Sequence, residues 1–366
     1  MEQSILDAFD SWGYDLLSTP CLELLSTVEL GVQPDQLQRL FKFSDIDGRV
    51  LALVGERTVS VARVAAGQLQ AAPRPLRLCY VGPTFTGHPP AGSRREAHQA
   101  GAELIGVHSP VADAEVVAMA ISALEACGVA DFQVEVGHIG FFGGLMAHLA
   151  EEQRALVHDA LVGRDLVELE QALAGTQMRA AEQELLLRFP ALRGGREILD
   201  AAASLVDDPA SALAIEELAE VHRLLEAHGV AGRVNLDLGA VRDFDYYSGI
   251  IFEVFAPGVG APLAVGGRYD GLLRRFGDDE PATGLVVFLD RVQELVNGGD
   301  SSAVATPLVV GYSADAADAV RRTASERRVG RRVVLEIEAT TEAALRRRGR
   351  ELNADEAVLA DAGPKP

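Results

Sequence analysis

The sequence lacks the features that mark secreted, zinc-binding or membrane-spanning proteins. Its 366 residues include three cysteines, Cys21, Cys79 and Cys127, and no C-x-x-C pair. This pattern indicates neither a disulfide framework nor a zinc site. No run of 18 or more apolar residues occurs, and acidic residues stand near the start, where a signal peptide needs basic ones. We therefore expect a cytoplasmic protein without a membrane segment.

Metal-ligand patterns are also missing. Of the eight histidines, His148 and His158 are ten residues apart, and His222 and His228 are six apart. None of them has metal-site spacing together with a second type of ligand. We expect neither a metal nor a cofactor.

Basic residues are in the minority, since the formal net charge is −21. Proteins that hold tRNA gain much of their affinity from lysine and arginine at phosphates, and a strongly acidic chain repels phosphates. This balance disfavours a tRNA partner. Acidity also serves solubility, however, and a local basic patch on such a chain would still bind RNA.

The content that is present indicates a large folded core. With 48% apolar residues, the chain is expected to fold as one large domain with additions. Segments 40–43 and 50–53 read as strands joined by an Asp-Gly turn at 45–48, so we predict a hairpin and an antiparallel core sheet. Segment 109–127 reads as a helix, and FQVEVGH at 132–138 reads as a strand.

The second half of the chain is more helical. From 141 to 228 apolar residues recur at three- and four-residue spacing, as in Leu166, Leu169 and Leu173. After residue 300, strand and helix patterns alternate, which is typical of a small α/β unit.

The stretch from Asp237 to Gly277 concentrates residues that suit a small polar ligand. Arg242 can pair with a carboxylate through two parallel hydrogen bonds. The flat walls with hydroxyl tips would come from three tyrosines: Tyr246, Tyr247 and Tyr269. An amphipathic strand pair with half-buried tyrosines is the simpler alternative.

Glycine and strand spacing add two further expectations. Gly266 and Gly267 suit a place where backbone approaches a ligand or another strand without a Cβ between them. From 79 to 106 the chain reads as a strand, a Gly/Pro-rich tip and a returning strand. Gln99 and Glu103 are four apart in that returning strand, so both point to one face, which is expected to be polar.

Four segments resemble the catalytic core of the class II histidyl-tRNA synthetases: LALVGERTVSVARV at 51–64, the strand pair at 79–106, the stretch at 237–277 and PATGLVVFLDRV at 281–292. Within the third of these, RDFDYYSG at 242–249 and GGRYDGL at 266–272 resemble the histidyl branch in particular. The resemblance spans residues 1 to about 295. It implies an α+β fold, in which a class II synthetase-like antiparallel sheet is flanked by helices. It also implies a core at 1–300 with a helical insertion at about 141–230, a dimer contact near 22–30, and a small unit at 301–366 similar to a truncated anticodon-binding domain.

The resemblance further implies a histidine-binding site made of Glu56, Thr58, Gln99, Glu103, Arg242, Tyr246, Tyr247 and Tyr269. In the family's arrangement Glu56 and Thr58 take the ammonium group with help from Gln99, and Glu103 and Tyr247 meet the imidazole. The arginine lies near the carboxylate, and the other two tyrosines form the walls. Acidic groups near the nitrogens and a guanidinium near the oxygens complement an amino acid with a basic ring.

The positions that handle ATP in the synthetases depart from the family pattern. Thr86 follows Phe85, where the synthetases have an arginine that grips the α-phosphate. Phe288 replaces a glycine that leaves room for adenine, and Val54 replaces another arginine. These changes imply that the chain does not form an adenylate.

A retained histidine site beside a degenerate ATP site resembles the regulatory subunits of ATP phosphoribosyltransferase. The resemblance implies a homodimer within a hetero-oligomer, with a short-form catalytic subunit as partner, L-histidine as ligand, and feedback inhibition of histidine biosynthesis. Two alternatives remain open: a catalytic histidyl-tRNA synthetase, and a histidine sensor that serves some other partner.

Overall fold

The computed structural model describes residues 1–89, 94–163, 165–188, 192–240, 247–298, 307–314, 316–329, 331–336 and 338–360. The chain forms two compact units, Met1–Val296 and Asn297–Pro366. Within the described ranges, none of the helices is long and apolar enough to cross a membrane.

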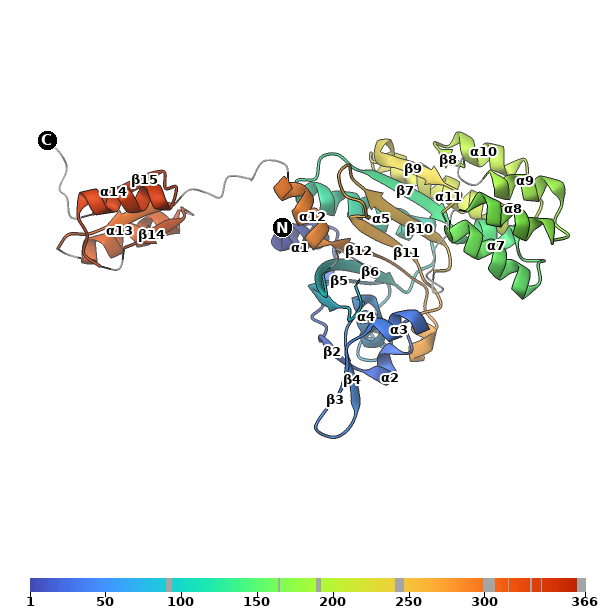
Figure 1. Cartoon of the computed structure of the whole chain (residues 1–366), viewed down its shortest axis with the longest axis horizontal. Coiled ribbons are helices and arrows are strands. Elements are labelled where there is room, and N and C mark those ends of the chain that lie inside the picture. Colours follow the sequence, from blue (N-terminus) through green and yellow to red (C-terminus); the bar gives the residue numbers. More distant parts are fainter. Residues whose placement is uncertain are drawn as a thin grey trace. The chain divides into compact units, whose positions relative to one another are not determined.

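A nine-stranded sheet forms the centre of the first unit (Figure 1). In spatial order its strands are β1 (Asp15–Leu16), β5 (Leu76–Phe85), β6 (Glu96–Ile105), β12 (Ala282–Phe288), β11 (Ala264–Arg268), β10 (Ile250–Phe255), β7 (Gln133–His138), β9 (Val234–Asp237) and β8 (Arg193–Gly194). The predicted α+β fold is confirmed, with one correction to the sheet. Neighbouring strands are antiparallel except for β1 with β5 and β7 with β9, which are parallel. Parallel pairing of β7 with β9 is possible because a long helical crossover joins them.

Helices pack on both faces of this sheet. Side chains alternate along β5, so Cys79 joins one cluster of buried apolar residues and Tyr80 joins another on the opposite face. The Cys79 face is covered by α1 and α5, and the Tyr80 face is covered by α4. The helices of the first unit outside the insertion are α1 (Glu2–Ser11), α2 (Leu25–Val28), α3 (Pro34–Arg39), α4 (Arg57–Ala66), α5 (Pro110–Ala126) and α12 (Leu289–Gly298).

Local sequence sets the ends of α5. The Ser109 side chain accepts a hydrogen bond from the backbone N–H of Val111, and Pro110 occupies the first turn, where its missing N–H costs nothing. The helix stops at Cys127, and Gly128 follows with φ of +84°, which glycine adopts readily. The predicted helix at 109–127 is confirmed.

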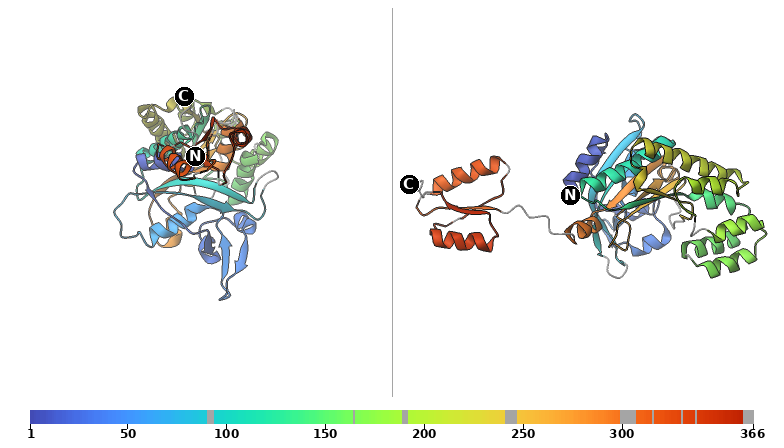
Figure 2. Two further views of the ribbon diagram at one scale, coloured as in Figure 1. Left: turned by 90° about the vertical axis from the view of Figure 1, so that its left-hand side faces the viewer. Right: turned by 90° about the horizontal axis from the view of Figure 1, so that it is seen from above.

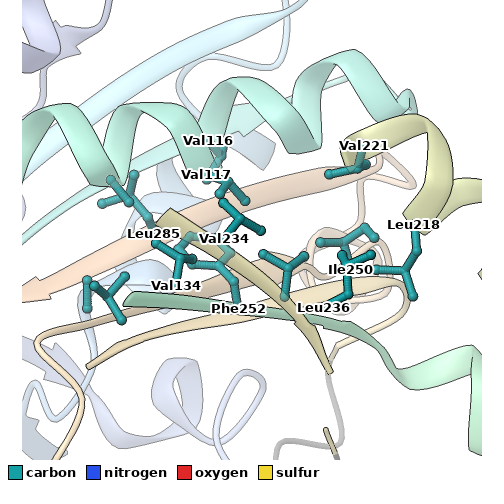
Figure 3. Packing of buried hydrophobic residues seen from close by; sticks show 14 of the residues in the cluster. Val116, Val117, Val134, Leu218, Val221, Val234, Leu236, Ile250, Phe252 and Leu285 are labelled. Atoms are coloured by element: carbon teal, nitrogen blue, oxygen red, sulfur yellow. The ribbon is translucent and has the colours of Figure 1, made fainter. Parts of the chain in front are cut away.

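The core of the first unit lies between α5 and the sheet. Figure 3 shows Val116 and Val117 of α5 beside Val134, Phe252 and Leu285 of the sheet, all of them buried. This large apolar cluster fixes the positions of these strands, and with them the side chains that project from the opposite face of the sheet.

The predicted hairpin is also confirmed. A small sheet contains β2 (Leu22–Leu24), β4 (Val50–Leu53) and β3 (Lys42–Ser44) in that order, with antiparallel pairing. At the turn, the Asp45 carboxylate accepts hydrogen bonds from the backbone N–H groups of Asp47 and Arg49, each at 2.8 Å. Gly48 has φ of +79°, as an Asp-Gly turn requires.

A helical segment connects β7 to β9, where the sequence predicts an insertion. Its elements are α6 (Ile139–Leu145), α7 (Glu151–Gly163), α8 (Leu166–Ala174), α9 (Ala180–Leu187), β8 (Arg193–Gly194), α10 (Glu197–Ala203), α11 (Pro209–Ala227) and the 3-10 turn η2 (Ala231–Arg233). The helical prediction for 141–228 is therefore confirmed apart from the two-residue strand β8.

The second unit has the predicted alternation of strands and helices. Its elements are β13 (Leu308–Gly311), α13 (Ala316–Arg328), β14 (Val333–Leu335), α14 (Glu342–Glu351) and β15 (Glu356–Leu359). The three strands are parallel in the order β14, β13, β15. The helices α13 and α14 lie on opposite faces of this sheet (Figure 2).

Candidate functional site

A cavity of about 220 Å³ opens in the first unit, on the face of the sheet that β6, β12 and β11 form. Its described lining consists of Val32, Gln36, Arg39, Leu40, Gly55, Glu56, Thr58, Phe85, Thr86, Gln99, Glu103, Tyr247, Val265, Gly266, Gly267, Tyr269, Gly284, Leu285, Val286 and Phe288. Six of the eight predicted histidine-binding residues are in this lining. The other two, Arg242 and Tyr246, lie outside the described residues.

Glu103 is the buried acid of this cavity. Its side chain is 1% exposed, and its Oε1 accepts a hydrogen bond of 2.8 Å from the Thr58 hydroxyl. The Tyr269 hydroxyl donates a second hydrogen bond, to Oε2. Burial raises the pKa of Glu103 to about 8, and the two hydrogen bonds offset only part of that effect. Burial therefore favours the protonated form of this carboxyl.

The register of the sheet makes room for Glu103. Glu103 on β6 lies opposite Gly284 on β12, and a Cβ at position 284 would lie 1.7 Å from the Glu103 Oε2 atom. Only glycine permits this arrangement without moving the carboxyl.

Gln99 lies on the same face of β6, as the four-residue spacing predicts, and also lines the cavity. It is 9% exposed, and its Oε1 has no hydrogen-bond partner within the described part of the chain. A buried acceptor without a partner is costly. A ligand that donates a hydrogen bond here would remove that cost.

Glu56 and Thr58 reach the cavity from the start of α4. Glu56 has an extended backbone and caps the start of α4, so the chain changes direction at this residue. Arg57 is 2% exposed at this corner and donates hydrogen bonds to the Pro83 carbonyl at 2.8 Å and the Thr19 hydroxyl at 2.7 Å. This buried guanidinium fixes the corner, a role that nothing in the sequence pattern signals.

The glycine pair on β11 allows strands to approach closely. A Cβ at Gly266 would lie 2.4 Å from the Gly284 carbonyl oxygen, and one at Gly267 would lie 2.4 Å from the Ile250 carbonyl oxygen. The geometry agrees with both roles expected for these glycines, because neighbouring strands approach closely here and both glycines also line the cavity.

The sequence patterns give no sign that α3 lines the cavity. Four residues from this helix and its flanks do so: Val32, Gln36, Arg39 and Leu40. They come from a segment without a motif or a chemical pattern, and long-range packing alone brings them to the site.

A second cavity, of about 500 Å³, adjoins the first. Phe288 and Thr86 line both cavities. The guanidinium of Arg291 lies 4.0 Å from the centre of the Phe288 ring and donates a hydrogen bond of 2.5 Å to the Pro262 carbonyl. The aromatic ring is thus held in place by Arg291, which lies near the end of the sequence block at 281–292.

This second cavity contains positive charge. Arg94, Arg95 and Arg291 all line it, although no sequence motif indicates this for the first two. Arg94 lies 3.6 Å from Asp290 and 3.8 Å from Glu294, so its charge is partly offset. Within the described ranges, no cluster of three or more histidine, cysteine or acidic residues is placed to hold a metal ion.

Comparison with known proteins places the chain in a family. The family described as histidyl-tRNA synthetase matches residues 1–292. The ATP phosphoribosyltransferase regulatory subunit of Moorella thermoacetica is 38% identical, and the match covers 96% of this chain and 92% of that protein. The chain belongs to the family of ATP phosphoribosyltransferase regulatory subunits. The subunit of the same name from Desulfitobacterium hafniense strain Y51 is 37% identical over 93% of this chain and 88% of the relative.

Solved structures agree with this family. A Bacillus halodurans structure titled "ATP phosphoribosyltransferase regulatory subunit/histidyl-tRNA synthetase" matches with a TM-score of 0.85 and 30% identity, covering 98% of this chain and 92% of that one. Histidyl-tRNA synthetase from Nostoc sp. PCC 7120 matches with a TM-score of 0.78 at 20% identity, over 96% of this chain and 84% of that one. The second likeness shows a shared fold only.

Proposed function

We propose that this chain is a non-catalytic regulatory subunit of ATP phosphoribosyltransferase, which acts in the first step of L-histidine biosynthesis. In this proposal it binds L-histidine in the cavity around Glu103, is needed for activity of a short-form catalytic subunit, and carries feedback inhibition. The observation that carries the proposal is the grouping of Glu56, Thr58, Gln99 and Glu103 with two tyrosines in one small cavity.

The chemistry of the cavity suits histidine. A basic imidazole ring placed against Glu103 would exchange the cost of burying that acid for a charge-assisted hydrogen bond. The α-ammonium group would satisfy the unpartnered Oε1 of Gln99 and approach Glu56. Tyr247 and Tyr269 would enclose the flat ring.

The neighbouring cavity supports binding without activation. Thr86 has no charge with which to hold an α-phosphate, and Phe288 is fixed beneath Arg291 where adenine would enter by resemblance to the synthetases. Loss of a single oriented donor to a developing anion costs roughly 10² to 10³ in rate. Both changes together would leave little or no adenylation.

Regulation requires two states of the assembled complex. Histidine shifts the complex toward the state it binds more tightly, and linkage makes the coupling between histidine and the substrates reciprocal. A coupling of about 1 to 3 kcal/mol is typical.

A homodimer through the small sheet is part of this proposal, because large apolar side chains are exposed there: Leu22, Leu24, Phe43, Ile46 and Val50.

The decisive experiment combines three measurements on the purified chain. We expect it to bind L-histidine in calorimetry, to show no histidine-dependent ATP–pyrophosphate exchange, and to restore histidine-sensitive phosphoribosyl transfer to a short-form catalytic subunit. Robust exchange with charging of tRNA would instead establish a synthetase. Histidine binding without any association with the phosphoribosyltransferase would point to a sensor for another partner.

A matched pair of variants tests whether histidine is sensed in this cavity. Glu103→Gln should remove histidine inhibition of the reconstituted complex, because it removes the buried acid that faces the ring. Glu220→Gln, on the exposed surface of α11, serves as the control and should keep normal inhibition. Unchanged inhibition in the Glu103 variant would contradict sensing in this cavity.

A further inference from the structure

Among the described residues that line the cavity, acidic side chains outnumber basic ones. Glu56 and Glu103 both line it, and among the described lining residues Arg39 is the only lysine, arginine or histidine. A free amino acid brings a carboxylate as well as an ammonium group. An arginine at the wall of the cavity is the natural partner for that carboxylate.

The end of α3 is held close to the place where the ammonium group is expected. Leu40 follows Arg39 and packs on Gly55, since a Cβ at Gly55 would lie 2.7 Å from the Leu40 Cδ2 atom. Gly55 in turn precedes Glu56. Because the ammonium and carboxylate groups of an amino acid share one carbon, a ligand with its ammonium near Glu56 has its carboxylate near this end of α3.

A second contact fixes the backbone at Arg39. Its carbonyl oxygen accepts a hydrogen bond of 2.5 Å from the backbone N–H of Gly87, the residue after Thr86. Arg39 is thus anchored between Gly55 and Thr86, both of which line the cavity. Its backbone position is set by the fold, while its side chain is not confined by burial.

The Arg39 guanidinium is available to a ligand. Its side chain is 54% exposed, and its ion pair is with Asp35, one turn earlier in α3, at 3.5 Å. Exposed pairs of this kind contribute little, because water screens both charges. A carboxylate in the cavity can therefore replace Asp35 as the partner of Arg39 at small cost.

We propose that Arg39 binds the carboxylate of the amino acid in this cavity and so selects a zwitterionic ligand over a purely cationic one. This inference rests on the proposed function and adds to it a residue that determines specificity. The family resemblance assigns the same carboxylate to Arg242, which lies outside the described residues.

The test compares two ligands on the full-length chain. L-histidine carries the carboxylate, and L-histidinol keeps the imidazole and the amine but has an alcohol in its place. Arg39→Gln should weaken L-histidine binding roughly tenfold in calorimetry, as expected for loss of a charge-assisted hydrogen bond. L-histidinol should bind the variant as well as the wild type or slightly better, because a repulsive cation has gone.

Two further variants sharpen the comparison. Arg39→Lys keeps the charge but not the paired donors, and should recover part of the lost L-histidine affinity. Arg223→Gln is the control, because Arg223 has the same 54% exposure and a carboxylate partner one turn earlier in its own helix. It should bind both ligands as the wild type does.

The outcomes separate the inference from the function. If the wild type does not bind L-histidine, the proposed function fails and Arg39 loses its role with it. If the wild type binds L-histidine but Arg39→Gln changes the affinity for both ligands equally, or for neither, only the role of Arg39 is overturned. A loss confined to the ligand with a carboxylate supports it.

Discussion

At the scale of single residues, Glu103 shows how burial makes a carboxyl both costly and useful. It is 1% exposed and takes hydrogen bonds from Thr58 and Tyr269, yet its pKa is raised to about 8. The strand period predicts that it shares a face with Gln99. Its burial depends on Gly284 across the sheet, which no local pattern connects with it.

The raised pKa of Glu103 predicts a pH dependence of stability. A carboxyl whose pKa is higher in the folded state stabilises the fold fully below its unfolded pKa of about 4.5. That contribution is lost as pH rises through about 8. We expect the stability of the ligand-free wild type, relative to Glu103→Gln, to fall between pH 5 and pH 9. Urea unfolding at several pH values measures this difference.

The control for this experiment is Glu220→Gln. A hydrogen bond from Arg223 lowers the pKa of Glu220, so any contribution of that carboxylate is present above its unfolded pKa and is lost only at acid pH. Its curve should therefore run parallel to that of the wild type from pH 6 to 9. A wild-type curve that is also parallel to that of Glu103→Gln would contradict a raised pKa for Glu103.

Gly284→Ala tests the space reserved for Glu103. The added Cβ would lie 1.7 Å from the Glu103 Oε2 atom, so the carboxyl has to move. We expect destabilisation of about 1 to 3 kcal/mol, as for other overpacked cores, together with weaker histidine binding. Thermal unfolding and calorimetry measure the two effects. Gly143→Ala on α6, where a Cβ meets no atom within 4 Å, should leave both unchanged or slightly raise stability.

At the scale of elements, the junction of β12 and α12 contributes to both cavities. Phe288 ends the strand, and Arg291 in the first turn of the helix stacks on its ring. In the sequence, the phenylalanine departs from the family pattern and the arginine agrees with it, and nothing connects the two. Their contact depends on the strand-to-helix turn, which brings residues three apart onto one face.

If Thr86 and Phe288 disable a nucleotide site, as proposed above, reversing both should allow ATP to bind. In Thr86→Arg with Phe288→Gly, a cation is provided for the phosphate and the ring leaves the place proposed for the adenine. We expect ATP to bind the double variant at least about tenfold more tightly than the wild type, since a hydrogen bond to a charged group contributes about 1.5 to 3 kcal/mol. Calorimetry with ATP measures this gain.

The two single variants are the controls for this experiment. Thr86→Arg retains the ring, and Phe288→Gly retains the uncharged threonine, so each should gain less than the double variant. Equal and negligible ATP binding in all four proteins would show that other residues close the second cavity.

At the scale of the whole molecule, local sequence predicts more of the fold than of the site. The helix at 109–127 and the Asp-Gly hairpin follow from caps, turns and spacing within short windows. The parallel pairing of β7 with β9 joins strands about one hundred residues apart, and no local signal reports it. The position of Arg39 at the cavity is of the same kind, since packing across the chain decides it.

The homodimer is the prediction that belongs to this scale. Ile46 at the hairpin tip is fully exposed and Phe43 is 41% exposed, so both are available to a second copy. Phe43→Asp with Ile46→Asp should weaken the dimer at least about tenfold, because charge would be buried in an apolar contact. Analytical ultracentrifugation measures the dimer dissociation constant. Val167→Asp, at an exposed apolar site on α8, should leave the dimer dissociation constant unchanged. An unchanged dissociation constant in the hairpin variant would exclude this contact.

The pairing of β7 with β9 has a consequence for how such a chain can evolve. Because these strands are parallel, the polypeptide leaves β7 at His138, at one end of the pair, and enters β9 at Val234, which lies opposite Val134 near the other end. The segment between them must therefore run back along the length of the strands, and α11, which packs on β7 and α5, belongs to that return. An unrelated module could take the place of this segment only if it kept a return of the same length.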